Sequence, residues 1–132
     1  MDEQVLKYWV AFNRIPKIGR ARFALLEHHF GSLERAWGAT PSDLEAAGLD
    51  SRIAQLIDSR RPAIDPEAES RRLESLDVRA ITWHDAEYPS RLKEIYDLPP
   101  ILYIRGALLP EDERSVSLVG TRKPTAYGRE VA

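Results

Sequence analysis

The chain has 132 residues, of which 43% are hydrophobic and 30% charged, a balance typical of globular rather than disordered proteins. It contains no cysteine, which excludes disulfides and thiolate metal sites and fits a reducing cytoplasm. With a net charge of −2, a nucleic-acid partner would have to meet a local basic patch. The acidic first residues are unlike a signal peptide, and no apolar run approaches the roughly 18 residues of a membrane span.

The first 30 residues predict two helices joined by a short turn. Apolar residues recur at helical spacing from about residue 3 to 13, and a second helix follows residues 15–19 and ends at Gly31. This is the outline of a helix-hairpin-helix, whose turn amides meet a nucleic-acid phosphate, although the usual motif has two glycines and this turn has one. The candidate phosphate contacts here are Lys17, Gly19, Arg20 and Arg22. The alternative is a structural hairpin with a solvated basic face.

Further short helices are predicted up to about residue 61. Thr40 and Asp50 stand where N-caps are needed, while Pro41 and Asp43 occupy the first and third positions of one helix. We therefore expect a compact bundle of about five helices over residues 1–62. The three tryptophans of the chain are expected to be core residues.

After this bundle the spacing of apolar residues changes from a helical to a strand pattern, and the sequence predicts helices that alternate with strands. Strands are predicted over residues 78–83, 101–106 and 116–119, the last as a buried strand of a parallel sheet. A parallel sheet buried on both faces needs more strands and helices than these. We therefore expect the sequence to be part of a longer protein with an incomplete sheet, whose exposed edges favour self-association and marginal stability.

The predicted strand over residues 116–119 leads into a glycine turn and a helix that Thr125 can cap. Such a turn directs several backbone N–H groups at one spot, where the helix dipole favours an anion. Arg122 offers a planar fork suited to phosphate, and Lys123 a more mobile point charge. The chemistry indicates a phosphate-binding turn, although the spacing is neither G-x-G-x-x-G nor a Walker A loop. An ordinary turn with solvated basic residues is the alternative.

Two motifs in series carry a resemblance to a known family. Residues 88–106 follow the pattern YP-x-x-L-x-x-I-x-D-x-P-x-x-L-Y-x-x-G, and residues 119–128 follow VG-[ST]-R-x-x-[ST]-x-YG. After a helical bundle of this size, they resemble the DNA-processing protein A family (DprA, also called Smf). The resemblance implies a sterile-alpha-motif-like or helix-hairpin-helix-like domain over residues 1–62. Residues 63–132 would then be the incomplete start of an extended Rossmann-like DNA-binding domain.

The same resemblance implies a function and a site. It implies a cytoplasmic bacterial protein that binds and protects incoming single-stranded DNA and loads the RecA recombinase during natural transformation. No catalytic turnover and no cofactor are implied, and the full-length family forms homodimers through a surface expected to be absent here. The implied DNA contacts are Gly120, Thr121, Arg122, Lys123, Thr125, Tyr127 and Gly128. Among them Arg122 is the charge-assisted contact, Gly120 allows close backbone approach, and Thr121 replaces the common serine.

Other functions stay open at this point. A nucleotide-binding or hydrolysing enzyme of the related lysine-decarboxylase-like Rossmann group would need a second glycine-rich motif and a catalytic glutamate, neither of which is visible. The helical bundle could instead be a protein-interaction module whose basic face meets an acidic partner. Tyr88 and Tyr127 can stack on a base or pack against the sheet. No metal site is expected, because His28, His29 and His84 lack a second ligand at metal spacing.

Overall fold

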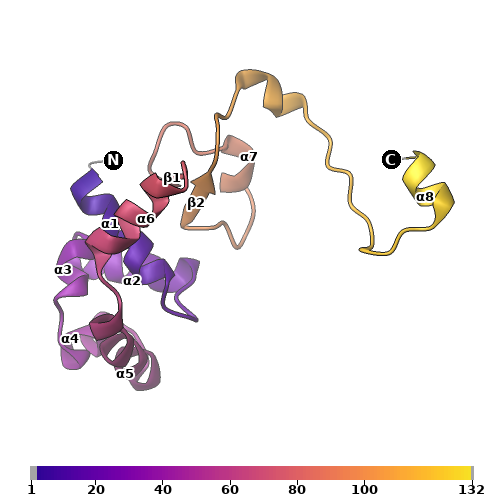
Figure 1. Cartoon of the computed structure of the whole chain (residues 1–132). Helices are drawn as coiled ribbons and strands as arrows, with labels where there is room; N and C mark the ends of the chain where they lie inside the picture. Colours follow the sequence, from indigo (N-terminus) through magenta and orange to yellow (C-terminus); the bar gives the residue numbers. More distant parts are fainter. Residues whose placement is uncertain (1–2, 132) are drawn as a thin grey trace.

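Helices make up more than half of the chain in the computed structural model, which describes residues 3–131 (Figure 1). The α-helices are α1 (Glu3–Asn13), α2 (Arg20–Phe30), α3 (Leu33–Trp37), α4 (Pro41–Ala46), α5 (Ser51–Arg60), α6 (Pro66–Ser75), α7 (Ser90–Lys93) and α8 (Ala126–Val131). Two 3-10 helices, η1 (Arg61–Ala63) and η2 (Pro110–Arg114), and two strands, β1 (Arg79–Thr82) and β2 (Ile101–Ile104), complete the described elements. None of the helices in residues 3–131 is long and apolar enough to span a membrane.

The helix boundaries of the bundle follow from local capping, as the sequence predicts. Thr40 and Asp43 form a reciprocal capping box at the start of α4, and the Asp50 side chain accepts a hydrogen bond from the N–H of Ile53 at 3.0 Å. Gly31 ends α2 with φ +75°, a left-handed conformation that glycine adopts without steric cost. The predicted five-helix bundle is therefore confirmed.

The α4 capping box gives a prediction about pH. Hydrogen bonds from the Thr40 hydroxyl and backbone lower the pKa of the Asp43 carboxyl below its ordinary value. A carboxyl whose pKa is lower in the folded state stabilises the fold above its unfolded pKa, and this stabilisation is lost as the pH falls through the folded pKa. We expect Asp43→Asn to reduce the free energy of unfolding at neutral pH, with a deficit that shrinks as the pH falls below about 5.

Urea unfolding at a series of pH values measures this deficit. Glu45→Gln is the matched control, because Glu45 lies on the same helix and forms no ion pair or hydrogen bond with its side chain in residues 3–131. A deficit of Asp43→Asn that is the same at all pH values would contradict the assignment.

Aromatic side chains form the centre of one hydrophobic core. The ring of Phe23 stacks on Trp9 at a centroid distance of 5.3 Å and meets the edge of Phe12 at 6.4 Å. Trp9 is fully buried, as predicted for the tryptophans, while Trp37 and Trp83 are half-buried against the same core.

This core continues beyond residue 62. Helix α6 packs along α1, and Ala80 of β1 and Ile101 of β2 belong to the same hydrophobic cluster. Residues 64–104 therefore pack on the bundle, and the division of the chain at residue 62 stays a prediction.

Arg61, at the end of the bundle, links α5 to the end of α3 and to the loop that follows α3. One guanidinium nitrogen, Nη1, donates to the carbonyl oxygens of Trp37 at 2.5 Å and Ala39 at 2.7 Å, and Nη2 donates to Asp58 at 2.7 Å. The side chain is only 15% exposed, so water reaches these carbonyl groups poorly once the guanidinium is removed.

We therefore expect Arg61→Met, which keeps the aliphatic stem, to lower the free energy of unfolding by about 2 kcal/mol. The neighbouring Arg60 is exposed and makes no ion pair in the described residues, so Arg60→Met should cost less than about 0.5 kcal/mol. Urea titration compares the two variants, and equal losses would show that Arg61 has no special role.

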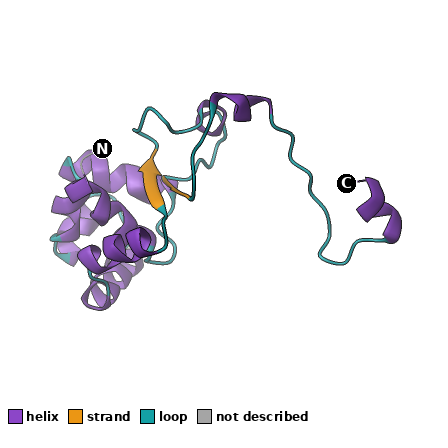
Figure 2. Ribbon diagram, turned by 45° about the horizontal axis from the view of Figure 1, so that its top comes forward, coloured by secondary structure: helices purple, strands orange, loops and turns teal. Residues whose placement is uncertain are grey.

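The sheet differs from the sequence prediction. The strands β1 and β2 are present where expected, but they pair antiparallel, with Arg79 opposite Ile104 and Thr82 opposite Ile101. The predicted parallel arrangement is wrong because residues 83–100, between the strands, do not form a crossover helix. They fold as turns around the one-turn helix α7 and return the chain to the end of β1. Figure 2 shows the small sheet beside the helices.

The predicted third strand is also wrong. Residues 115–119 form no ladder with β1 or β2, and the side chains of Val116, Leu118 and Val119 are 85%, 76% and 94% exposed. In Figure 1 this segment runs away from the helical body towards α8. Its β-branched composition favours an extended backbone, but a strand also needs a neighbour, and the described residues provide none at this point.

Candidate nucleic-acid interface

The glycine turn predicted to bind phosphate lies on the surface before α8. Thr125 is the N-cap of α8, as predicted: its hydroxyl accepts a hydrogen bond from the N–H of Gly128 at 3.1 Å, and its carbonyl accepts one from Arg129 at 3.2 Å. The first-turn amides of Ala126 and Tyr127 have no intrahelical acceptor, because helix starts leave such groups open. A phosphate oxygen could accept from them.

Every candidate side chain of this turn is exposed. Arg122 and Lys123 form no ion pair within residues 3–131, so both charges are available to a ligand, and Tyr127 is 75% exposed. The two glycines of the motif differ. A Cβ at Gly120 would meet nothing within 4 Å, whereas one at Gly128 would lie 3.4 Å from the capping hydroxyl of Thr125. Both distances leave room for a Cβ, so the packing of the described residues does not require glycine at either position.

The second candidate group surrounds the turn between α1 and α2. Gly19 is the N-cap of α2 and supplies no side-chain cap, and Lys17 has a positive φ of 68°. Arg22 has a structural role: it donates to the carbonyl of Lys17 at 2.6 Å and lies 3.4 Å from the carboxylate of Asp50. The Arg20 guanidinium lies 5.9 Å from the ring centre of Tyr96.

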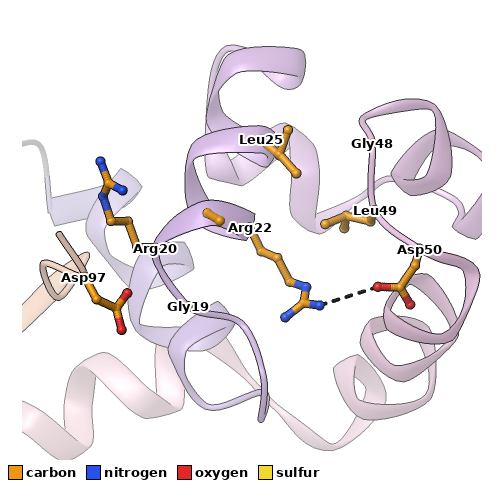
Figure 3. Close-up of a pocket in the computed structure, with 9 residues that line it drawn as sticks. Gly19, Arg20, Arg22, Leu25, Gly48, Leu49, Asp50 and Asp97 are labelled. Carbon is orange, nitrogen blue, oxygen red and sulfur yellow. Dashed lines mark hydrogen bonds and ion pairs between the residues drawn. The ribbon is translucent and has the colours of Figure 1, made fainter.

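Gly19, Arg20 and Arg22 line an open pocket of about 440 Å³, in which Arg22 points to Asp50 on one side and Asp97 lies near Gly19 on the other (Figure 3). Two carboxylates in the lining oppose the binding of a phosphate there. Of the four predicted secondary contacts, Gly19, Arg20 and Arg22 therefore share the lining of one pocket, and Lys17 lies outside this lining. The charges around the pocket favour an anion less than those of the turn before α8.

The structure does not bring the two candidate groups together. The turn at residues 120–128 lies at the end of the extended segment, well away from α2 (Figure 1). Each group must be judged as a separate surface.

Tyrosine environments decide which rings can stack on a base. Tyr88 is 3% exposed, and its hydroxyl donates to the carbonyl of Pro99 at 2.7 Å, so the packing alternative holds for this residue. Its burial also raises the pKa of the phenol. Tyr127 is open to solvent, as a stacking role requires.

Sequence reasoning missed Tyr96, which is 92% exposed beside Arg20 and occupies a variable position of the first motif.

Acidic residues near the sheet serve the fold. Asp85 accepts hydrogen bonds from the N–H and hydroxyl of Thr82 at 2.7 and 3.0 Å, and Glu87 forms an ion pair with Arg79. Within residues 3–131, no three His, Asp or Glu side chains are placed to hold a metal ion.

Fold and site together describe a largely helical protein that presents an exposed basic turn at the start of a helix. Residues 79–132 match the family model described as DNA recombination-mediator protein A. Protein Smf of Synechocystis sp. is 32% identical over 126 residues, which are 92% of this chain and 32% of that protein. DNA processing protein DprA of Bacillus subtilis is 33% identical over 93 residues, 70% of this chain and 29% of that protein.

The chain belongs to the DprA/Smf family. It spans about a third of the length of the curated relatives it matches. No solved structure gives a significant match.

Proposed function

We propose that this chain binds single-stranded DNA through residues 120–128. The observation that carries the proposal is that the family match over residues 79–132 includes this whole turn, where the structure exposes every candidate side chain. Relatives that bear the names DNA processing protein and Smf support a DNA ligand.

The chemistry of the turn favours a single strand. Arg122 and Lys123 supply two positive charges for phosphates, and the amides at the start of α8 supply hydrogen-bond donors. The exposed ring of Tyr127 can stack on a base, which is accessible in a single strand and covered in a duplex. Thr121 and Thr125 add hydroxyl groups, although that of Thr125 already caps α8.

We further propose that the chain shares the wider activity of its family. The bound strand would be protected and passed to a RecA recombinase during natural transformation, in the cytoplasm and without catalytic turnover. The description of the matching family as a recombination mediator supports this role.

At the level of fold, we propose that residues 1–62 are a sterile-alpha-motif-like or helix-hairpin-helix-like unit and that residues 63–132 begin the family's Rossmann-like domain. The helical hairpin at Gly19 supports the first assignment and the match over residues 79–132 the second.

Fluorescence anisotropy with a labelled oligo-dT strand and a duplex of equal length, at two salt concentrations, tests the proposed ligand. We expect tighter binding to the single strand, weakened by salt with a slope of about 0.7 per phosphate neutralised. Equal binding to the duplex, or no binding at low salt, would contradict the proposal for this chain.

A further inference from the structure

The loop before β2 places an aromatic ring beside the pocket at the start of α2. Tyr96 is 92% exposed, and its ring centre lies 5.9 Å from the Arg20 guanidinium. Arg20 also lines the pocket, and so does Asp97, the residue after Tyr96. Tyr96 therefore lies at the rim of this pocket, and its ring contributes almost nothing to the hydrophobic core.

One of the two carboxylates in the pocket is open to a ligand. Asp50 caps α5 and lies 3.4 Å from the guanidinium of Arg22, so its oxygens already have partners. The Asp97 side chain is exposed and makes no hydrogen bond or ion pair in the part of the chain that the structure describes. A carboxylate has only acceptor oxygens, so a ligand of Asp97 must present N–H or O–H donors.

A nucleobase combines a flat face for the Tyr96 ring with N–H donors on its edge. Guanine alone among the four DNA bases has two adjacent donors, N1–H and the N2 amino group, on the edge used for base pairing, and these match the two oxygens of one carboxylate. Adenine and cytosine pair one donor with one acceptor on that edge, and thymine sets its single N–H between two carbonyl groups that a carboxylate repels. In a duplex this edge is occupied, so the base must be unpaired.

We propose that Tyr96, Arg20 and Asp97 bind a guanine base of single-stranded DNA. Tyr96 stacks on the base, and Asp97 accepts hydrogen bonds from its N–H groups. Arg20 lies against the Tyr96 ring and supplies a positive charge that offsets Asp97. The two carboxylates of the pocket oppose a phosphate but not the edge of a base, so the strand must carry its phosphates outside the lining.

This inference rests on the proposed binding of single-stranded DNA, but it uses residues remote from the glycine turn. Its side chains come from α2 and from the loop before β2, which pack within the part of the chain that shares one hydrophobic core. The chain leaves that core at Ile104, the end of β2 opposite to the loop that holds Asp97 (Figure 1). The contact between Arg20 and Tyr96 therefore does not depend on residues 105–132.

Fluorescence anisotropy of the full chain with two labelled strands of equal length tests the site. One strand is all-dT, and in the other isolated guanines interrupt the dT run. We expect the guanine strand to bind about tenfold more tightly, through stacking and the paired hydrogen bonds. Hypoxanthine in place of each guanine lacks the N2 amino group and should lose most of this gain. Equal affinity for the all-dT and guanine strands would overturn the proposal.

Variants assign the preference to the named side chains. Tyr96→Ala should weaken binding of the guanine strand about tenfold and change that of the all-dT strand by less than about twofold, whereas Tyr96→Phe keeps the ring and should behave as the wild type. Asp97→Asn replaces one acceptor oxygen by a donor and should remove the preference for guanine over hypoxanthine. Both side chains are exposed, so circular dichroism and thermal melting should be unchanged. A Tyr96→Ala variant that keeps the guanine preference would overturn the proposal.

The outcomes separate this site from the turn at residues 120–128. Binding of the guanine strand alone, lost in Tyr96→Ala, would contradict the proposed role of the turn and support this site. Binding of the all-dT strand without any preference for guanine would do the reverse. A free guanine nucleotide presents the same base, so dGMP is added as a competitor. Displacement of the guanine strand by micromolar dGMP would assign the pocket to a free nucleotide and overturn its assignment to DNA.

Discussion

Phe23→Ala should lower the free energy of unfolding by about 3–5 kcal/mol, the range expected for a fully buried aromatic residue. The Phe23 ring is fully buried, stacks on Trp9 and meets the edges of Phe12 and Trp83 at 6.4 Å. Its removal leaves a cavity between α1, α2 and the start of the loop after β1, which a packed interior fills only in part. Since small domains are stable by only about 5–15 kcal/mol, a large fraction of the molecules should unfold under mild conditions.

Urea unfolding followed by tryptophan fluorescence measures this loss. Leu25→Ala is the control on the same helix: its side chain is 38% exposed, so the loss should be about 1 kcal/mol or less. Similar losses for Phe23→Ala and Leu25→Ala would mean that the aromatic cluster does not hold the bundle together.

Reversal of both charges in the glycine turn, Arg122→Glu with Lys123→Glu, should weaken binding to oligo-dT about 100-fold at low salt. Each change removes an exposed positive charge and adds a negative one beside the phosphates. The loss should be similar for strands of different sequence, and the dependence of log affinity on log salt should flatten by about 0.7 for each lost contact.

The matched control reverses two adjacent arginines elsewhere, Arg71→Glu with Arg72→Glu on the exposed face of α6. It changes the net charge by the same amount but leaves residues 120–128 intact, so binding should fall far less. An equal loss in both double variants would assign the affinity to the overall charge of the protein and would remove Arg122 and Lys123 from the interface.

Local signals in the sequence determined the helical bundle. Thr40, Asp43 and Asp50 satisfy helix N–H groups within three residues of their own position, and Gly31 ends α2 by its own backbone conformation. Interactions of such short range depend on neighbouring residues alone, so the sequence specifies them without knowledge of the fold. The Thr125 cap of α8 follows the same rule, and the two motifs over residues 88–106 and 119–128 indicate the family from sequence alone.

Only the tertiary structure decided the features that need a distant partner. The antiparallel pairing of β1 and β2 depends on how residues 83–100 turn back, and the burial of Tyr88 depends on the carbonyl of Pro99, 11 residues away. Arg22 is a candidate phosphate contact in the sequence, yet in the fold it lies beside Asp50 and the carbonyl of Lys17. Residues 116–119 have the composition of a buried strand but remain exposed, because burial and strand pairing come from neighbours that local composition does not specify.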